Sequence, residues 1–312
     1  AGKIDGKWKK YSCSEYIQTS DALAYGLLNI GLTKNDKICI ISNNRPEWSL
    51  TDMGINKIGA INTPLYPNST RKDYKYIIND CEAKLVFVEN KDIFAKINGL
   101  ENEIKSLEHI YSFEKITNVK HWRELIEIGL INPKNEETEK IQQSISENDL
   151  FTLIYTSGTT GNPKGVMLTH SNILSQLYSI EHLLDLGKSD RGISFLPLSH
   201  VFERMLEYYY LFKGVSIYYG SIENIGNDLK EIKPTVMPTV PRLLEKVYDK
   251  ILTKGEALTG LKRKMFFWAL NLGLRHEYNG RNGLFYEFQL AIANILVFKK
   301  WREAIGGRVR MI

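Results

Sequence analysis

The decisive stretch of this 312-residue sequence is Tyr155-Thr156-Ser157-Gly158-Thr159-Thr160-Gly161-Asn162-Pro163-Lys164-Gly165-Val166. It combines hydroxyl side chains and glycines with a lysine that stands three residues after Gly161. Glycine allows the backbone to turn tightly and to approach a ligand closely. Hydroxyls and backbone N–H groups suit the oxygens of a phosphate, and a lysine adds a positive charge. The stretch therefore predicts a loop that binds a polyphosphate.

The residues on either side of this loop predict a strand before it and a helix after it. Leu150 to Tyr155 form a short apolar run with β-branched residues, which is typical of a buried strand. Ser171 is a candidate N-cap for a helix that runs to about Leu186. The loop is not the common P-loop, because Gly158 is not followed at the required spacing by Gly-Lys-Ser/Thr. A glycine- and threonine-rich surface turn is the alternative.

The first half of the chain alternates short apolar runs with amphipathic ones, which predicts strands joined by helices. Strand–helix–strand spacing this short implies parallel strands with right-handed crossovers. The predicted fold class is therefore α/β with mainly parallel sheets. We expect helices at residues 14–30, 46–58 and 69–80, and strands at residues 37–42, 60–65 and 84–89.

The second half of the chain predicts three more strands and several helices. Residues 132–149 have only two apolar side chains, Ile141 and Ile145, so we expect a solvated connection there. The aromatic run from Met205 to Phe212 predicts a helix. The other expected elements are strands at residues 191–197, 215–220 and 235–240, and helices at residues 241–254 and 283–302.

Composition narrows the classes of function. The net charge of +5 is mild for this length, and no dense basic tract of the kind that binds nucleic acid is present. The three cysteines, Cys13, Cys39 and Cys81, are far apart and form no Cys-x-x-Cys pair. This predicts reduced thiols in a cytoplasmic protein, without a zinc site. The apolar run from Leu290 to Phe298 is far shorter than the roughly 20 residues that cross a bilayer.

The stretch from Thr156 to Gly165 resembles the phosphate-loop signature of the adenylate-forming enzymes, which include the acyl-CoA synthetases. Three further blocks are similar to the long-chain fatty acid:CoA ligase branch and occur in the order found in that family. The blocks are Asn44-Arg45-Pro46-Glu47-Trp48, Phe195-Leu196-Pro197-Leu198-Ser199-His200-Val201-Phe202-Glu203-Arg204, and Val240-Pro241-Arg242-Leu243-Leu244-Glu245-Lys246-Val247-Tyr248.

The resemblance implies that the parent enzyme activates a long-chain fatty acid with ATP. The carboxylate attacks the α-phosphate to give an acyl-adenylate and pyrophosphate, and the thiol of coenzyme A then displaces AMP. Because two anions meet in the first step, charge neutralisation and positioning are its main demands. Two alternatives stay open. One is an adenylating ligase for another carboxylic acid, and the other is a non-catalytic nucleotide-binding module.

The resemblance also implies roles for individual residues. Lys164 and the loop hydroxyls would hold the β- and γ-phosphates, and Thr159 would help to bind Mg²⁺, which takes few protein ligands. His200 would lie beside the acyl pocket near the adenylate, as a base, a gate or part of the wall. The expected catalytic residues are therefore Thr159, Lys164 and His200. The expected nucleotide-binding residues are Thr156, Ser157, Gly158, Thr159, Thr160, Gly161 and Lys164.

The resemblance further implies a large N-terminal domain of two interleaved α/β subdomains. Residues 46–188 would form the first, and residues 11–45 would join residues 189–312 in an incomplete second. The adenine, ribose and coenzyme A sites, the second Mg²⁺ ligand and a C-terminal lid domain have no matching position in this sequence. We therefore expect the chain to be a fragment of a longer enzyme, and inactive by itself.

Two aromatic segments bear on the acid and on partners. The resemblance makes part of the helix at residues 205–212 a wall of the acyl tunnel. The segment from Phe266 to Trp301 ends in Lys299-Lys300-Trp301-Arg302, which fits either core burial or a face on a membrane surface. The sequence leaves open a peripheral contact with the inner face of a membrane, and also a homodimer.

Overall fold

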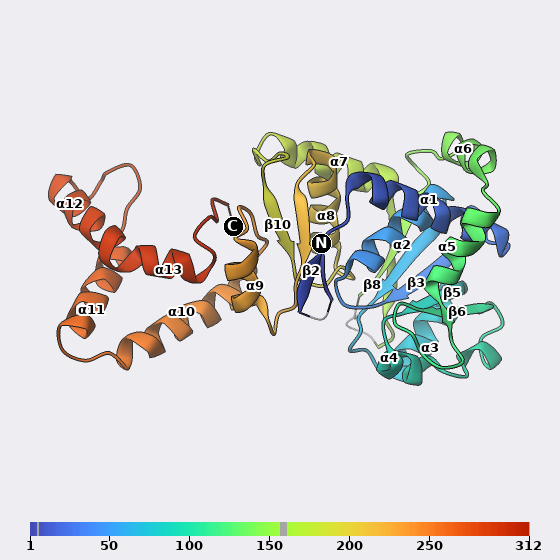
Figure 1. Ribbon diagram of the computed structural model, residues 1–312, viewed down its shortest axis with the longest axis horizontal. Helices are drawn as coiled ribbons and strands as arrows, with labels where there is room; N and C mark the ends of the chain where they lie inside the picture. Colours follow the sequence, from blue (N-terminus) through green and yellow to red (C-terminus); the bar gives the residue numbers. More distant parts are fainter. Residues whose placement is uncertain (5, 157–160, 312) are drawn as a thin grey trace.

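The computed structural model describes residues 1–4, 6–156 and 161–311. Two sheets lie side by side with helices around them, and a helical arm extends from one end (Figure 1). The larger sheet has the strand order β7-β6-β5-β3-β4-β8-β9, in which only the pair β8–β9 is antiparallel. Its strands are β3 (Lys37–Ile41), β4 (Ile61–Leu65), β5 (Ala83–Val88), β6 (His109–Ser112), β7 (Lys120–His121), β8 (Leu150–Thr156) and β9 (Lys164–Thr169).

The central strand β3 shows why this sheet forms. Ile38 and Ile40 are fully buried in a core with the helices on one face, whereas Cys39 and Ile41 are fully buried in a second core on the other face. Successive side chains of a strand point to opposite faces, so a continuous apolar run can fill two cores. The helices of the first face are α1 (Cys13–Asn29), α2 (Pro46–Lys57) and α5 (Trp122–Ile131), and those of the second are α3 (Arg71–Asp80) and α4 (Lys91–Ile97).

Local signals set the helix ends. Ser12 and Glu15 form a capping box at the start of α1, because each side chain accepts from the backbone of the other. Pro46 occupies the first position of α2, as the sequence predicted. Helix α7 (His170–Glu181) is capped by Thr169 instead of the predicted Ser171. The predicted position was two residues late.

The smaller sheet has the order β10-β11-β1-β2. Strands β10 (Arg191–Ser194) and β11 (Ser216–Tyr219) are parallel, and the hairpin of β1 (Gly2–Ile4) and β2 (Lys7–Lys9) adds to the edge of β11. Helix α8 (Val201–Lys213) contributes Tyr209 and Tyr210 to the same core that Ile38 and Ile40 fill. This shared core therefore joins the two sheets. Helix α9 (Ile225–Ile232) covers the smaller sheet with Leu229 and Ile232.

The arm, residues 241–304, is a separate helical extension (Figure 1). It consists of α10 (Pro241–Glu256), α11 (Gly260–Leu274), α12 (Leu284–Ala293), a π-helical turn (Asn294–Phe298) and α13 (Lys299–Ala304). Its small core contains Ala269, Leu272, Ala293 and Val297, with Trp268, Leu290, Phe298 and Trp301 packed against it. The arm therefore has its own apolar cluster, distinct from the cores of the sheets.

Two expectations about secondary structure are wrong. The connection at residues 132–149 contains a helix, α6 (Asn135–Gln143), which Lys134–Glu137 pairing and an acidic first turn support despite its exposure. The strand expected at residues 235–240 is reduced to isolated bridges from Val236 to Gly192 and to Met311. Proline has no N–H group, so Pro234 and Pro238 interrupt any longer ladder there.

The assignment of residues 11–45 to the second subdomain is also wrong for their strand. Strand β3 lies between β4 and β5, in the sheet formed by residues 46–188. Its two faces are buried because helices cover both faces of the larger sheet at this strand. Residues 2–9 instead join the smaller sheet with residues 191–219. The chain thus still crosses between the two sheets more than once.

Helices α1 and α5 cross closely at two glycines, which predicts a sharp effect of added volume. A Cβ at Gly129 would lie 1.9 Å from the carbonyl oxygen of Ala22. Backbone atoms cannot yield as a flexible side chain can, so Gly129→Ala is expected to cost about 1–3 kcal/mol of unfolding free energy, measured by urea denaturation. The control is Gly226→Ala in α9, where a Cβ would meet nothing within 4 Å. The control should be neutral or slightly stabilising, and equal destabilisation by both would contradict this account.

Candidate functional site

The strands of both sheets end at a shared crevice of about 760 Å³. Parallel pairing brings the carboxyl ends of β3, β4 and β5 to one edge, and the residues after β10 and β11 line the opposite wall. In open α/β sheets, ligands bind outside the carboxyl ends of strands. Residues that line the crevice directly after these strands include Ser42, Tyr66, Glu89, Phe195 and Gly220.

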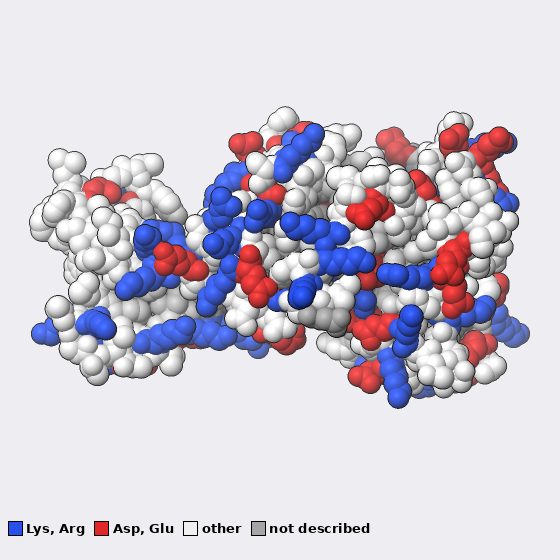
Figure 2. Space-filling view, viewed as in Figure 1, with Lys and Arg blue, Asp and Glu red and all other residues white. Residues whose placement is uncertain are grey.

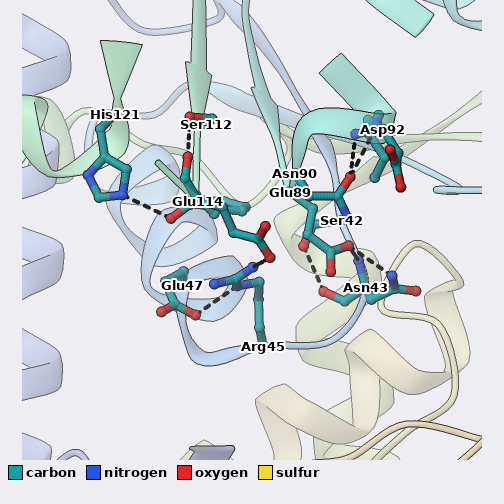
Figure 3. Close-up of polar contacts among 12 residues, drawn as sticks. Ser42, Asn43, Arg45, Glu47, Glu89, Asn90, Asp92, Ser112, Glu114 and His121 are labelled. Carbon is teal, nitrogen blue, oxygen red and sulfur yellow. Dashed lines mark hydrogen bonds and ion pairs between the residues drawn. The ribbon is translucent and has the colours of Figure 1, made fainter. Parts of the chain in front are cut away.

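One wall of the crevice is a network of charged and polar side chains (Figure 3). Arg45 Nε donates to Glu47 Oε2 at 2.9 Å, and its guanidinium lies 3.5 Å from Glu114 Oε1. The backbone N–H and the side-chain amide of Asn43 both donate to Glu89 Oε2, at 2.7 and 2.8 Å. These loops are held by contacts with one another. The positive charge of Arg45 is therefore already balanced by carboxylates.

Asn44 connects this wall to the segment after β10. Its side-chain amide donates to Ser194 Oγ at 2.9 Å and to the carbonyl oxygen of Leu196 at 2.7 Å. Its carbonyl oxygen accepts from the backbone N–H of Leu198 at 3.1 Å. Two of the sequence blocks, residues 44–48 and residues 195–204, thus meet through one side chain.

His200 is the N-cap residue of α8 and is exposed. Its Nδ1 accepts from the backbone N–H of Phe202 at 3.2 Å. In the neutral imidazole the proton therefore sits on Nε2, which is the nitrogen available to a ligand. Val201 and Phe202, which follow it, are 36% and 42% exposed and add apolar surface beside the ring.

The described part of the loop presents groups suited to an anion. Thr156 ends β8 and Lys164 begins β9, and the two residues are direct partners in the antiparallel pair. Both side chains are exposed. Gly161 has a φ of 121°, and a Cβ there would meet no atom of the described residues within 4 Å. Ser157, Gly158, Thr159 and Thr160 lie outside the described residues.

The described residues offer no preformed metal cage. In residues 1–4, 6–156 and 161–311, no group of three or more His, Cys, Asp or Glu side chains is placed to hold a metal ion. The expected Mg²⁺ ligand Thr159 lies outside the described residues.

Helix α8 also buries two carboxyl groups that the sequence analysis gave no site role. Burial raises the pKa of Glu203 to about 8 and the pKa of Glu207 to about 7. Glu207 Oε1 accepts from the hydroxyl of Tyr219 at 2.8 Å, and Oε2 of each glutamate has no partner among the described residues. Charged residues inside a helix that is otherwise apolar and aromatic were the available signal.

Thr156, Gly161, Lys164 and His200 are not among the residues that line the crevice. A glycine- and hydroxyl-rich stretch directly after a strand that is parallel to its neighbour, in an α/β domain, is nevertheless typical of a nucleotide-handling protein of the adenylate-forming class. The sequence matches the family described as "AMP-binding enzyme" over residues 3–278, and the chain belongs to that family.

Curated relatives cover nearly all of this chain. Long-chain-fatty-acid–CoA ligase ACSBG2 of Xenopus laevis is 31% identical over 98% of the chain and 43% of the relative. Long chain acyl-CoA synthetase 3 of Arabidopsis thaliana is 32% identical over 99% of the chain and 48% of the relative. Human long-chain-fatty-acid–CoA ligase 1 is 34% identical over 99% of the chain and 46% of the relative. The chain thus spans about half the length of the relatives that it matches.

Solved structures show the same fold. A long-chain-fatty-acid-CoA ligase (FadD1) from Archaeoglobus fulgidus superposes with a TM-score of 0.67, at 20% identity, over 80% of this chain and 50% of that chain. The N-terminal domain of FACL13 from Mycobacterium tuberculosis gives 0.63, at 20% identity, over 74% and 56%. The predicted fold class, mixed α/β with mainly parallel sheets, is confirmed.

The raised pKa of Glu203 predicts that stability falls as pH rises. In the unfolded state the carboxyl group of Glu203 has a pKa near 4.5 and is ionised above that pH. In the folded state, the same group keeps its proton up to about pH 8. Each retained proton costs about 1.4 kcal/mol per pH unit in that window. Glu203→Gln removes this cost, so its melting temperature should exceed that of the wild type at pH 8, and the gap should shrink at pH 5.

Glu139→Gln in the exposed helix α6 is the control for this measurement. Its pH profile should follow the wild type. Parallel profiles for Glu203→Gln and the wild type would show that Glu203 is ionised in the folded protein.

Proposed function

We propose that this chain is the nucleotide-binding part of a ligase that activates a long-chain fatty acid with ATP and passes it to coenzyme A. The observation that carries the proposal is the placement of the two ends of the loop, Thr156 and Lys164. It leaves β8 at Thr156 and returns at the exposed Lys164, on strands of the sheet whose carboxyl ends border the crevice. The relatives are named long-chain-fatty-acid–CoA ligases or a long chain acyl-CoA synthetase, which supports the acid and the acceptor.

The proposed roles follow the chemistry of each group. Lys164 and the loop, from Thr156 to Gly161, would neutralise and hold the β- and γ-phosphates, and Thr159 would offer an oxygen to Mg²⁺. These charges are needed because the fatty acid carboxylate must approach the α-phosphate, another anion. His200 offers Nε2 beside the exposed Val201 and Phe202, where we place the carboxyl end of the acyl chain. The thiol of coenzyme A then displaces AMP.

We propose a smaller role in the acyl tunnel for the helix at residues 205–212 than its aromatic content suggested, because two of its aromatic side chains are buried in the protein core. Leu206, Tyr209 and Tyr210 are buried, with Tyr209 and Tyr210 in the shared core of the two sheets. Among the aromatic side chains of α8 that follow residue 205, Phe212 is the most exposed, at 53%. The tunnel wall is therefore proposed at the start of α8, and the middle of the helix serves packing.

The protein in its natural length should form thioesters most efficiently with long acids. Each buried CH₂ contributes about 0.8 kcal/mol, so kcat/KM should rise steeply from acetate toward stearate until the tunnel is full. Lys164→Ala should slow acid-dependent ATP–pyrophosphate exchange about ten- to a hundredfold, because a charge-assisted phosphate contact is worth roughly 1.5–3 kcal/mol. The exposed Lys72→Ala on α3 is the matched control.

The outcomes separate the alternatives. A maximum at acetate, an aromatic acid or an amino acid would indicate an adenylating ligase for another acid. No exchange with any acid, together with retained nucleotide binding, would indicate a non-catalytic nucleotide-binding module. The 312-residue segment alone is expected to show no acid-dependent turnover, since the residues proposed for adenine and ribose have no match in it.

We also propose that the arm contacts the inner face of a membrane from the cytoplasm. The continuous helix from α12 to α13 turns several large apolar side chains outward, away from the small core of the arm. Residues 259–304 contain eight Lys and Arg but three Asp and Glu, a surplus equal to the net charge of +5 of the whole chain. The outward side chains are Leu284 (90% exposed), Phe285 (75%), Phe288 (64%) and Ile295 (72%).

Figure 2 shows Lys and Arg along the lower side of the arm and next to a large uncharged surface at its outer end. Apolar side chains next to cationic ones suit the interface of an anionic bilayer. Within the described residues, none of the helices combines the length and the apolar character needed to cross a membrane. A surface contact by the arm is therefore the form of membrane binding that we propose.

Phe285→Ser together with Phe288→Ser should abolish flotation of the natural-length protein with vesicles of phosphatidylcholine and phosphatidylserine. The wild type should float with these vesicles, less so at high salt, and less with phosphatidylcholine alone. Leu130→Ser with Ile131→Ser on α5 is the control, because those side chains are also exposed, by 67% and 76%. Wild-type protein that stays unbound would contradict the proposal, and a dimer lost only in the arm variant would assign the surface to a second copy.

A further inference from the structure

Arg204 is a buried guanidinium that joins three elements. It is 2% exposed and lies on α8, one helical turn after His200. Its Nη2 donates to Asp52 Oδ1 on α2 at 2.5 Å, and its Nη1 donates to Thr152 Oγ1 on β8 at 2.6 Å. Its Nε donates to the hydroxyl of Tyr208 at 2.7 Å. Each of the three nitrogens of the fork therefore has a defined partner.

The partners of Arg204 are themselves connected. Thr152 donates to the carbonyl oxygen of Asn62 on β4 at 2.6 Å, and the side-chain amide of Asn62 donates to Asp52 Oδ1 at 2.6 Å. The hydroxyl of Tyr208 donates to Asp52 Oδ2. The result is a closed network that spans α2, β4, β8 and α8. The planar guanidinium has fixed donor directions, so it constrains how α8 is placed against α2 and β8.

Aromatic rings enclose the same guanidinium. Its central carbon lies 5.5 Å from the ring centroid of Trp48, 5.1 Å from that of Phe151 and 5.6 Å from that of Tyr208. These rings exclude water from the ion pair of Arg204 and Asp52, whose side chains are 2% and 3% exposed. A buried ion pair contributes little to stability compared with apolar residues of the same volume, because desolvation opposes its attraction. What the network provides is a defined geometry.

That geometry connects the two parts of the candidate site. Thr152 lies four residues before Thr156 on β8, and the side chains of both residues point to the same face of the strand. Arg204 lies four residues after His200, so both lie on the same face of α8. A shift or rotation of α8 against β8 at the Arg204–Thr152 contact is therefore transmitted to the separation of His200 and Thr156.

We propose that Arg204 and Thr152 are positioning residues that set the placement of His200 relative to Thr156 at the end of β8, without touching the nucleotide. The expected effect on kcat rests on the proposed function, because it assumes that the protein catalyses adenylation. Displacing a catalytic group by about 1 Å can lower a rate about a hundredfold while leaving binding almost unchanged. The network therefore acts on kcat for adenylation and leaves the KM for ATP nearly constant.

Thr152→Val is the test variant because it removes the hydroxyl and nearly preserves the side-chain volume. In the natural-length protein it should lower kcat of acid-dependent ATP–pyrophosphate exchange about ten- to a hundredfold, with KM for ATP changed less than about twofold. Thr152→Ser restores the hydroxyl and should recover most of the rate. Thr51→Val is the matched control, since its buried Oγ1 has no partner among the described residues. Equal kcat in the valine variants at 51 and 152 would overturn the proposal.

Tyr208→Phe supplies a second route if Thr152→Val does not fold. It removes the hydroxyl that links Arg204 and Asp52, but keeps the ring, which packs 5.4 Å from the ring of Phe151. It should give the same separation of kcat and KM. Loss of kcat in proportion to loss of folded protein in both variants would indicate a purely structural role and would overturn the proposal.

A distance measurement distinguishes failure of this inference from failure of the proposed function. Spin labels on Met167→Cys in β9 and Phe212→Cys in α8, with the exposed Cys13 changed to Ser, report the placement of α8 against the loop strands. Thr152→Val should shift or broaden the distance distribution, and Thr152→Ser should restore it. An unchanged distribution overturns the positioning role. Absence of wild-type exchange, with the distribution still shifted, would reject only the proposed function.

Discussion

Parallel pairing around β4 is the constraint on which the candidate site depends. Strand β4 lies between β3 and β8, so residues that leave these strands emerge at the same edge of the sheet. The antiparallel strand β9 then brings Lys164 back to that edge, next to Thr156. Were β8 reversed, the loop would leave the sheet at the edge opposite to the carboxyl ends of β3 and β4. The position of the loop therefore depends on the pairing of β8 with β4 at Thr152 and Asn62, which lie outside the loop.

The parts of the fold that the sequence predicted are those whose signals are local. Buried strands such as β3 and β5 are nearly continuous apolar runs, and Pro46 marks the start of α2 by its fixed backbone angle. The hairpin of β1 and β2 has no such signal, because each strand has three residues, most of them exposed. Its sheet partner β11 lies more than two hundred residues away in the sequence. Pairing over that separation is decided by tertiary structure.

The same distinction applies to the site. The loop and the block around His200 were found because their residue types indicate a chemistry, and the structure places Thr156 and Lys164 side by side. The contact of Arg204 with Asp52 was not predicted, since 152 residues separate them and either charge alone suggests a solvated surface. Asn44 presents the same difficulty, because an amide in a turn gives no indication of the backbone groups that it will bind. Polar residues whose partners are distant in sequence are thus the main class that sequence patterns miss.

The pairing of Thr156 with Lys164 has a consequence for how this loop can vary among related sequences. Ladder pairing fixes the register of β9 against β8, and side chains alternate between the faces of a strand. A residue added between these partners can be absorbed by a longer loop without a change of register. A residue added inside β9 would instead turn the side chains that follow it to the other face, unless a bulge absorbs it. Related sequences should therefore differ in the length of this loop more readily than in the length of β9.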